Sequence, residues 1–346
     1  MEWHMAEVNE RSQRQVARWL FVCAAVIALM VVIGGLTRLT GSGLSITEWD
    51  LVMGTVPPLN EAQWQVVFEQ YKQSPEYRIV NAGMSMAEFQ SIFWWEYVHR
   101  LVGRAVGFVF LIPFLYFVIR RKVTGRQAWK LLLLFVLGGL QGVLGWYMVK
   151  SGLVKDPHVS HYRLTAHLSL AFLLFGATLW QGLHFRDGCP AKEKEGVFRK
   201  VSLGLLFLVM FQVALGAMVA GLKAGYMFNT FPKMGEYWVP PGMGHSVLIN
   251  GIAIQFIHRI TAYFVLIMIG AMWWKSRRTV LNARQRNGFD FLLLVVMIQF
   301  VLGVFTLIFH VPVSLAALHQ FGALVLLGGG VYLCHVLRFS PKTSQA

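Results

Sequence analysis

The sequence predicts an all-α integral membrane protein whose eight transmembrane helices form two duplicated four-helix bundles. Two observations lead to this prediction: eight long apolar segments, and three short motifs that occur once in each half of the chain. Hydrophobic residues make up 56% of the sequence and charged residues only 14%, with a mean hydropathy of +0.55. Soluble domains are closer to one quarter charged, so the composition favours a membrane protein over a large soluble one.

Each apolar segment is long enough to cross a bilayer, which takes roughly 20 helical residues. In chain order the segments cover residues 17–37, 95–119, 129–149, 163–185, 201–222, 252–274, 290–311 and 314–337. The sequence therefore divides into an N-terminal half at 17–185, a cytoplasmic linker at 186–200 and a C-terminal half at 201–337. A long loop at about 38–94 follows the first segment and contains an amphipathic stretch at 64–71.

The basic residues indicate the orientation of these helices. Of the 31 lysines and arginines, 20 lie in alternate segments, at the N-terminus, in three connecting loops and at the C-terminus. This positive-inside pattern places both termini in the cytoplasm and argues against a nucleic-acid-binding surface, despite the net charge of +15. Acidic residues before the first segment, and no cleavable signal, predict a multi-pass protein of the bacterial inner membrane. The three cysteines fit no disulfide framework.

Three motifs recur in the same order in both halves. EYVHR at 96–100 corresponds to QFIHR at 255–259, QGVLG at 141–145 to QFVLG at 299–303, and RLTAHL at 163–168 to LAALHQ at 315–320. The first pair is separated by 159 residues. Each half therefore carries two similarly placed histidines.

These four histidines are the candidate metal ligands. His99, His167, His258 and His319 lie near the outer ends of helices that all run from outside to inside, so we expect them at similar depth. Each is followed four positions later by glycine or alanine, which would leave a groove for a flat macrocycle. Two histidines on facing helices can ligate a haem iron. Zinc is the competing metal, but it usually needs three or four protein ligands.

Glu96 is the candidate acid or base. It lies one helical turn before His99, and the second half has the uncharged Gln255 in its place. A carboxyl group beside a haem could move protons; the alternative is a structural ion pair with Arg100, four residues on. His158 and His161 in an outside loop are weaker candidates for proton exchange.

Five arginines are candidate contacts for haem propionates, because a guanidinium binds a carboxylate with two parallel hydrogen bonds. Arg100 and Arg259 directly follow their histidines and recur in register. Arg38, Arg104 and Arg163 also lie toward the outer helix ends. For Arg38 and Arg163, snorkelling to the membrane surface is an equally good explanation.

The combined motifs resemble those of the haem A synthases. The resemblance rests on GGLTRLTGSGLS at 34–45, EYVHR at 96–100 and FIHR at 256–259, and it covers residues 16–338. It implies oxidation of the C8 methyl group of haem O to a formyl group, which gives haem A for cytochrome c oxidase. Some members of that family have cysteine pairs in outside loops, which this chain lacks.

The resemblance also implies roles for the histidines. His258 and His319 would hold a permanent haem b, His99 and His167 would hold the substrate haem O, and Glu96 would take part in catalysis. Haem O synthase, an electron-transfer partner and a second copy of the chain are candidate partners, besides the lipid bilayer. Two alternatives from other classes are a di-haem cytochrome b-type electron-transfer subunit and a haem transporter.

Overall fold

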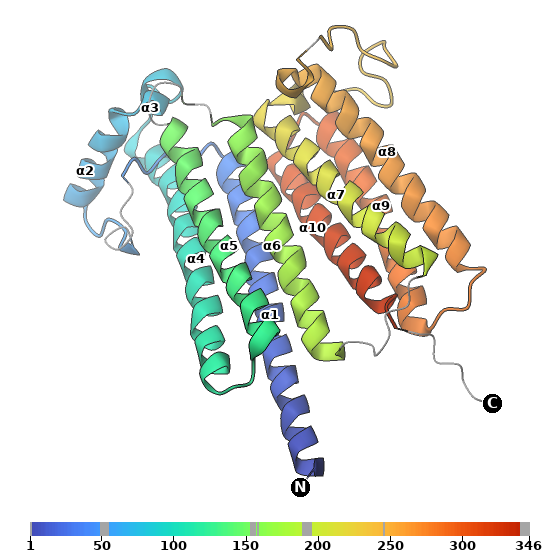
Figure 1. Ribbon diagram of the computed structural model, residues 1–346. Helices are drawn as coiled ribbons and strands as arrows, with labels where there is room; N and C mark the ends of the chain where they lie inside the picture. The colour runs from blue at the N-terminus through green and yellow to red at the C-terminus, as the bar shows by residue number, and fades with distance from the viewer. Residues whose placement is uncertain are drawn as a thin grey trace.

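A computed structural model of the chain shows a bundle of long helices with short helices at one end (Figure 1). It describes residues 2–48, 55–152, 157, 159–188, 196–244 and 246–339. Eight helices in these residues are long and apolar enough to cross a membrane, which confirms the predicted all-α membrane fold. They are α1 (Glu2–Leu39), α4 (Met86–Ile119), α5 (Gly125–Gly152), α6 (His161–Asp187), α7 (Val197–Gly221), α8 (Gly251–Ser276), α9 (Ala283–Ile308) and α10 (Val313–Val336).

Helix α4 begins earlier than its apolar segment predicts, at Met86 rather than at residue 95. A capping box starts it: the Ser85 side chain accepts from the Glu88 backbone N–H, and the Glu88 carboxylate accepts from the Ser85 backbone. The apolar pattern did not reveal this start because the added turns are only partly hydrophobic. The N-terminal end of α4 therefore projects beyond the apolar segment.

Two short helices of the first outside loop pack on that projecting end (Figure 1). They are α2 (Glu61–Lys72), which contains the predicted amphipathic stretch, and α3 (Pro75–Ile79). Buried aromatic rings join them to α4, with Phe68 and Tyr71 of α2 stacked on Phe89 of α4 at centroid distances of 4.9 and 5.0 Å. This aromatic cluster holds the loop over the outer end of the first half.

The helices of each half pack in the same order. In the first half α1 contacts α4 and α6, and α5 contacts both α4 and α6. In the second half α7 contacts α8 and α10, and α9 contacts both α8 and α10. Each set of four thus forms a closed ring, and the internal duplication itself stays a prediction. The linker between the halves lies largely in residues 189–195, outside the described residues.

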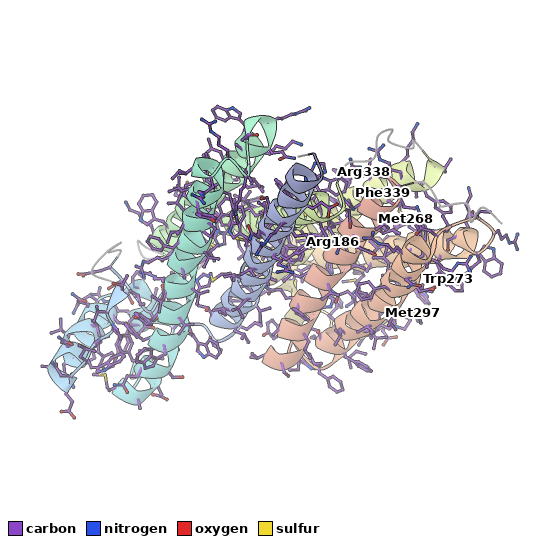
Figure 2. All side chains as sticks on the ribbon, turned by 90° about the horizontal axis from the view of Figure 1, so that it is seen from below. Arg186, Met268, Trp273, Met297, Arg338 and Phe339 are labelled. Carbon is purple, nitrogen blue, oxygen red and sulfur yellow. The ribbon has the colours of Figure 1, made fainter. Side chains whose placement is uncertain are left out.

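The two halves meet through α1, α6, α7 and α10, with α6 in contact with both α7 and α10. At the end where α1 begins and α10 ends (Figure 1), Asp187 of α6 accepts a hydrogen bond from Arg284 of α9 at 3.0 Å and lies 3.6 Å from the His335 ring of α10. Figure 2, seen from this end, places Arg186 and Arg338 toward the middle of the bundle. Polar contacts therefore join the halves at the end opposite the predicted site.

Candidate functional site

Each of the four predicted histidines lies against a glycine of the preceding spanning helix. His99 of α4 lies against Gly34 of α1, where an added Cβ would be only 2.9 Å from the His99 Nε2 atom. His258 of α8 lies against Gly216 of α7, with the corresponding distance to Cε1 at 3.2 Å. A side chain at either glycine would push against the imidazole, so the glycines make room for the rings.

The second histidine of each half repeats the arrangement. An added Cβ would lie 3.0 Å from the His167 ring at Gly145 of α5, and 2.9 Å from the His319 ring at Gly303 of α9. These two glycines end the QGVLG and QFVLG motifs that recur in the sequence. The repeated motifs therefore correspond to one repeated contact, histidine against glycine.

Three of the four histidines are also held by a glutamine, and the sequence analysis missed this contact. The Nε2 groups of Gln141, Gln212 and Gln299 donate to the backbone carbonyls of His167, His258 and His319 at 3.0, 2.9 and 2.8 Å, respectively. Each glutamine precedes the facing glycine by four residues. That spacing was the available signal, since residues four apart share a helix face. The corresponding residue before Gly34 is Met30.

The two histidines of each half lie near each other, and their pairing as ligands of one iron stays a prediction. The rings of His99 and His167 interact electrostatically with each other, as do those of His258 and His319. The Nδ1 atoms of His167, His258 and His319 are buried without a hydrogen-bond partner, so one ring nitrogen of each histidine is available to a ligand. Among the described residues no group of three or more His, Cys, Asp and Glu side chains could hold a metal ion. The donor set therefore fits two bis-histidine haems better than zinc.

Glu96 is buried near the start of α4, and both of its carboxylate oxygens accept hydrogen bonds. Its Oε1 atom accepts from Arg100 Nη2 at 2.7 Å and from Nε at 3.1 Å. Its Oε2 atom accepts from the Ser45 hydroxyl and the Ile46 backbone N–H, both at 2.8 Å. The ion pair with Arg100 weighed in the sequence analysis is thus present. Glu96 also ties the first outside loop to α4.

The second half makes the same loop contact without a charge. The Gln255 amide donates to the Phe228 carbonyl at 3.0 Å, and Arg259 donates to the Phe228 and Thr230 carbonyls at 2.7 and 2.8 Å. Arg100 binds the carbonyls of Ile46 and Glu48 in the first half. At this loop contact the halves therefore differ in the acid alone, because the arginine binds loop carbonyls in both.

The remaining predicted arginines lie in different surroundings. The Arg38 guanidinium donates to the Ala220 carbonyl of α7, across the junction between the halves. Arg163 stacks over the Tyr147 ring, 4.1 Å from its centroid. Arg104 lies on α4, four residues beyond Arg100.

Of the two weaker histidine candidates, one lies within the described residues. His161 Nε2 lies 3.1 Å from the Leu248 carbonyl oxygen, and its Cβ packs against Gly221 of α7. His161 therefore joins the start of α6 to the second half. His158 lies outside the described residues.

A comparison with protein families identifies the chain. The model of the COX15-CtaA family, described as cytochrome oxidase assembly protein, matches residues 17–330. The chain belongs to this family. It is 46% identical over 335 residues to the Heme A synthase of Nitrosospira multiformis, covering 94% of both chains. It is 43% identical to the Heme A synthase of Parvibaculum lavamentivorans, covering 96% of both, and 44% identical to that of Rhodospirillum centenum, covering 96% of this chain and 90% of the other.

This member of the cytochrome oxidase assembly family has a second buried acid above Glu96. Glu76 of α3 is only 8% exposed, and its Oε2 atom has no hydrogen-bond partner. Burial, followed by the nearby Glu96 carboxylate, raises the pKa of Glu76 from 4.5 to about 8, against a smaller opposing effect of the Tyr71 hydroxyl. Tyr71 accepts a hydrogen bond from Asn81 at 2.7 Å, and burial raises the pKa of Tyr71 as well.

Glu76 should make the protein less stable as the pH rises. Because its pKa is higher in the folded state, the folded protein binds more protons between pH 4.5 and about 8, so the free energy of unfolding falls across that window and levels off above it. We expect Glu76→Gln to remove this decline and to stabilise the protein at pH 8.5 by roughly 2–4 kcal/mol, since one pKa unit corresponds to about 1.4 kcal/mol. Thermal unfolding of purified protein in detergent at pH 5 to 9 measures the effect.

The control for this prediction is Glu69→Gln, which removes an exposed acid of α2 that pairs with Lys72. It should leave the pH profile of the melting temperature unchanged. A Glu76→Gln profile that runs parallel to that of the unaltered protein would contradict the assignment of Glu76.

Proposed function

We propose that this chain is a haem A synthase, which oxidises the C8 methyl group of haem O to the formyl group of haem A for cytochrome c oxidase. The observation that carries the proposal is the similarity to relatives named Heme A synthase, which extends over nearly the full length of both chains. The two histidine pairs support it, because an enzyme that modifies one haem with the help of another needs two such sites.

The two halves have different roles in this proposal. His258 and His319 hold haem b, which would supply one-electron transfer when bound. His99 and His167 hold the substrate haem O. The second half has the neutral Gln255 where the first half has an acid, so only the first half offers a proton acceptor beside its haem.

Glu96 is the proposed proton acceptor of the first half. Oxidation of a methyl group to a formyl group passes through an alcohol and releases protons, and a positioned carboxylate can take them up. Glu96 lies one turn before His99 on α4, and its hydrogen bonds from Ser45, Ile46 and Arg100 fix its orientation.

The arginines are proposed to bind haem propionates at the outer end of the bundle. A guanidinium has five N–H donors, so Arg259 can bind loop carbonyls and a carboxylate together. Arg100 is proposed because it recurs in register with Arg259. The Nε atom of Arg259 is buried without a partner, which supports this role for Arg259. Arg38, Arg104 and Arg163 are proposed as propionate contacts only because they lie toward the same helix ends as Arg100 and Arg259.

The proposal extends to the organisation of the chain and to its partners. We propose residues 17–185 as the substrate half and 201–337 as the haem b half, each formed by one closed ring of four helices. Haem O is the proposed substrate. Haem O synthase, an electron-transfer partner and a second copy of the chain stay predictions.

The proposed function predicts which haems the purified protein contains. Acid extraction followed by mass spectrometry should give haem b together with haem O or haem A. Haem b alone, at two molecules per chain, would contradict the proposal and favour the di-haem cytochrome. A single type of haem that appears on both sides of the membrane in proteoliposomes would favour the haem transporter.

We further propose that the protein lies in the bacterial inner membrane with both termini in the cytoplasm. Helix α1 begins and α10 ends at the same end of the bundle (Figure 1), and the clustered basic residues lie toward that end. A reporter that is active only outside the membrane should be active when fused after Lys155 and silent when fused after Lys194. The reverse pattern would invert the orientation and place the histidines on the cytoplasmic side.

A further inference from the structure

We propose that the three glutamines are positioning residues that fix three of the four haem-ligating histidines, and that Met30 leaves His99 mobile enough to admit and release the substrate haem. This inference rests on the proposed function, because it assigns the substrate haem to the half that contains His99. It concerns residues to which the family resemblance gave no role.

The glutamine and the glycine on one helix hold the facing histidine at two points. In the second half, Gln212 Nε2 donates to the His258 carbonyl at 2.9 Å, and Gly216, one turn later, contacts the His258 ring. The hydrogen bond fixes the height of that turn of α8 relative to α7, and the glycine fixes the distance between the helices. Gln299 and Gly303 do the same for His319.

The first half has this arrangement at only one of its two histidines. Gln141 and Gly145 hold His167 as in the second half. His99 has the glycine contact from Gly34, but Met30 occupies the position of the glutamine. A thioether has no hydrogen to donate, so Met30 cannot bind the His99 carbonyl.

Met30 instead fills space beside the histidine. Its terminal methyl group lies 3.6 Å from the position of a Cβ on Gly103, one turn beyond His99 on α4. Methionine is flexible and adapts to changes in its surroundings, so this contact tolerates a small shift of α4 that a hydrogen bond would oppose.

A second contact shows which helix is held in place. Gln320, adjacent to His319 on α10, donates to the Val31 carbonyl of α1, at a distance of 2.6 Å. Its amide also packs against Gly35 of α1. The haem b half therefore holds the turn of α1 that carries Met30. Thr37 of α1 also donates to the Trp95 carbonyl of α4 at 3.3 Å, so the proposed freedom is confined to the turn of α4 at His99, whose carbonyl receives no bond from Met30.

This asymmetry matches the different demands on the two sites. A cofactor site should retain its haem through many turnovers, so both of its ligands are held by glutamines. A substrate site must open once per turnover, so one of its ligands is held less firmly. The exchangeable haem would thus be released from the His99 side while His167 stays in place.

The test is the rate at which each haem leaves purified protein for an excess of apomyoglobin. Met30→Gln should restore the missing hydrogen bond and slow the release of the haem O or haem A held in the first half. The release of haem b should not change. One interhelical hydrogen bond in a membrane protein contributes about 0.6–1 kcal/mol, which corresponds to roughly a three- to fivefold slower release. Met30→Leu, which has similar volume and no donor, is the matched control and should behave like methionine.

The converse variant keeps the test decisive if Met30→Gln does not fold. Gln212→Met gives His258 the environment of His99, so haem b should leave roughly three- to fivefold faster and its low-spin electron paramagnetic resonance signal should broaden. Equal release rates in Met30→Gln and Met30→Leu, or unchanged haem b release in Gln212→Met, would overturn the inference. Failure of the proposed function would instead appear in the identity of the extracted haems, whatever their release rates.

Discussion

Replacement of Glu96 by glutamine should eliminate most haem A formation while haem b stays bound at His258 and His319. The variant makes the first half resemble the second, where Gln255 occupies the equivalent position. If Glu96 accepts protons during oxidation of the bound haem, its loss should lower the rate by about a hundred- to ten-thousandfold. The measurement is haem A formed per folded protein in membranes, with haem b content as the measure of folding.

The contacts of Glu96 define the competing explanation and its control. Both carboxylate oxygens accept hydrogen bonds, so glutamine would place an N–H₂ group opposite donors that now have an acceptor. Part of the effect could therefore come from a displaced outside loop. Ser45→Ala removes one of these bonds and keeps the acid, at a cost of about 1 kcal/mol. It should retain most haem A formation.

The two variants separate chemistry from structure. A large loss in Glu96→Gln with nearly normal turnover in Ser45→Ala would identify the acid itself as essential. Nearly normal haem A per haem b in Glu96→Gln would show that Glu96 serves only to hold the loop through Arg100, Ser45 and Ile46. Equal large losses in both would assign the effect to the position of the loop.

The fold could be predicted from the sequence because the bilayer imposes length and composition on each helix. Eight apolar segments were enough to place the eight spanning helices. The start of α4 was not predictable in this way, since its first turns are stabilised by aromatic contacts with α2 and α3 rather than by lipid. Those contacts join residues distant in sequence, and periodicity carries no information about them.

The site was predictable to the extent that it is repeated. Duplicated motifs singled out His99, His167, His258 and His319 as candidate ligands, and in the structure the two histidines of each half lie near each other. The roles of the arginines were harder to predict from the sequence than the positions of the histidines. Arg100 and Arg259 recur in register chiefly because each binds the backbone of an outside loop. A recurring residue can thus mark a repeated structural contact as well as a repeated ligand contact.

The hydrogen bonds from the glutamines to the histidine carbonyls were not predicted from the sequence. Gln212 lies in a helix whose counterpart in the first half has methionine at that position, so comparison of the two halves alone could not reveal it. The hydrogen bond becomes apparent only when α7 and α8 are packed together. The two sites share their histidines but differ in this hydrogen bond. His258 has it from Gln212, whereas the corresponding residue for His99 is Met30.

Replacement of His258 or His319 by alanine should remove the low-spin haem b spectrum while the protein stays inserted in the membrane. Each change would delete one of the two proposed axial ligands. The fold should survive, because the ring occupies a gap made by a facing glycine and the backbone hydrogen bond from Gln212 or Gln299 does not depend on the histidine side chain. Absorption spectra of reduced minus oxidised membranes, normalised to protein, measure the loss.

Two further measurements make this prediction specific to ligation. Added imidazole should enter the gap beside Gly216 in His258→Ala and restore part of the low-spin spectrum, since it supplies the missing nitrogen without the chain. His184→Ala removes a histidine at the opposite end of α6, next to Phe185, and should keep the full spectrum. A full haem b spectrum in His258→Ala or His319→Ala, combined with its loss in His99→Ala or His167→Ala, would exchange the roles of the two halves. The substrate would then lie in the half without the acid, and the catalytic assignment of Glu96 would have to be abandoned together with the assignment of haem b.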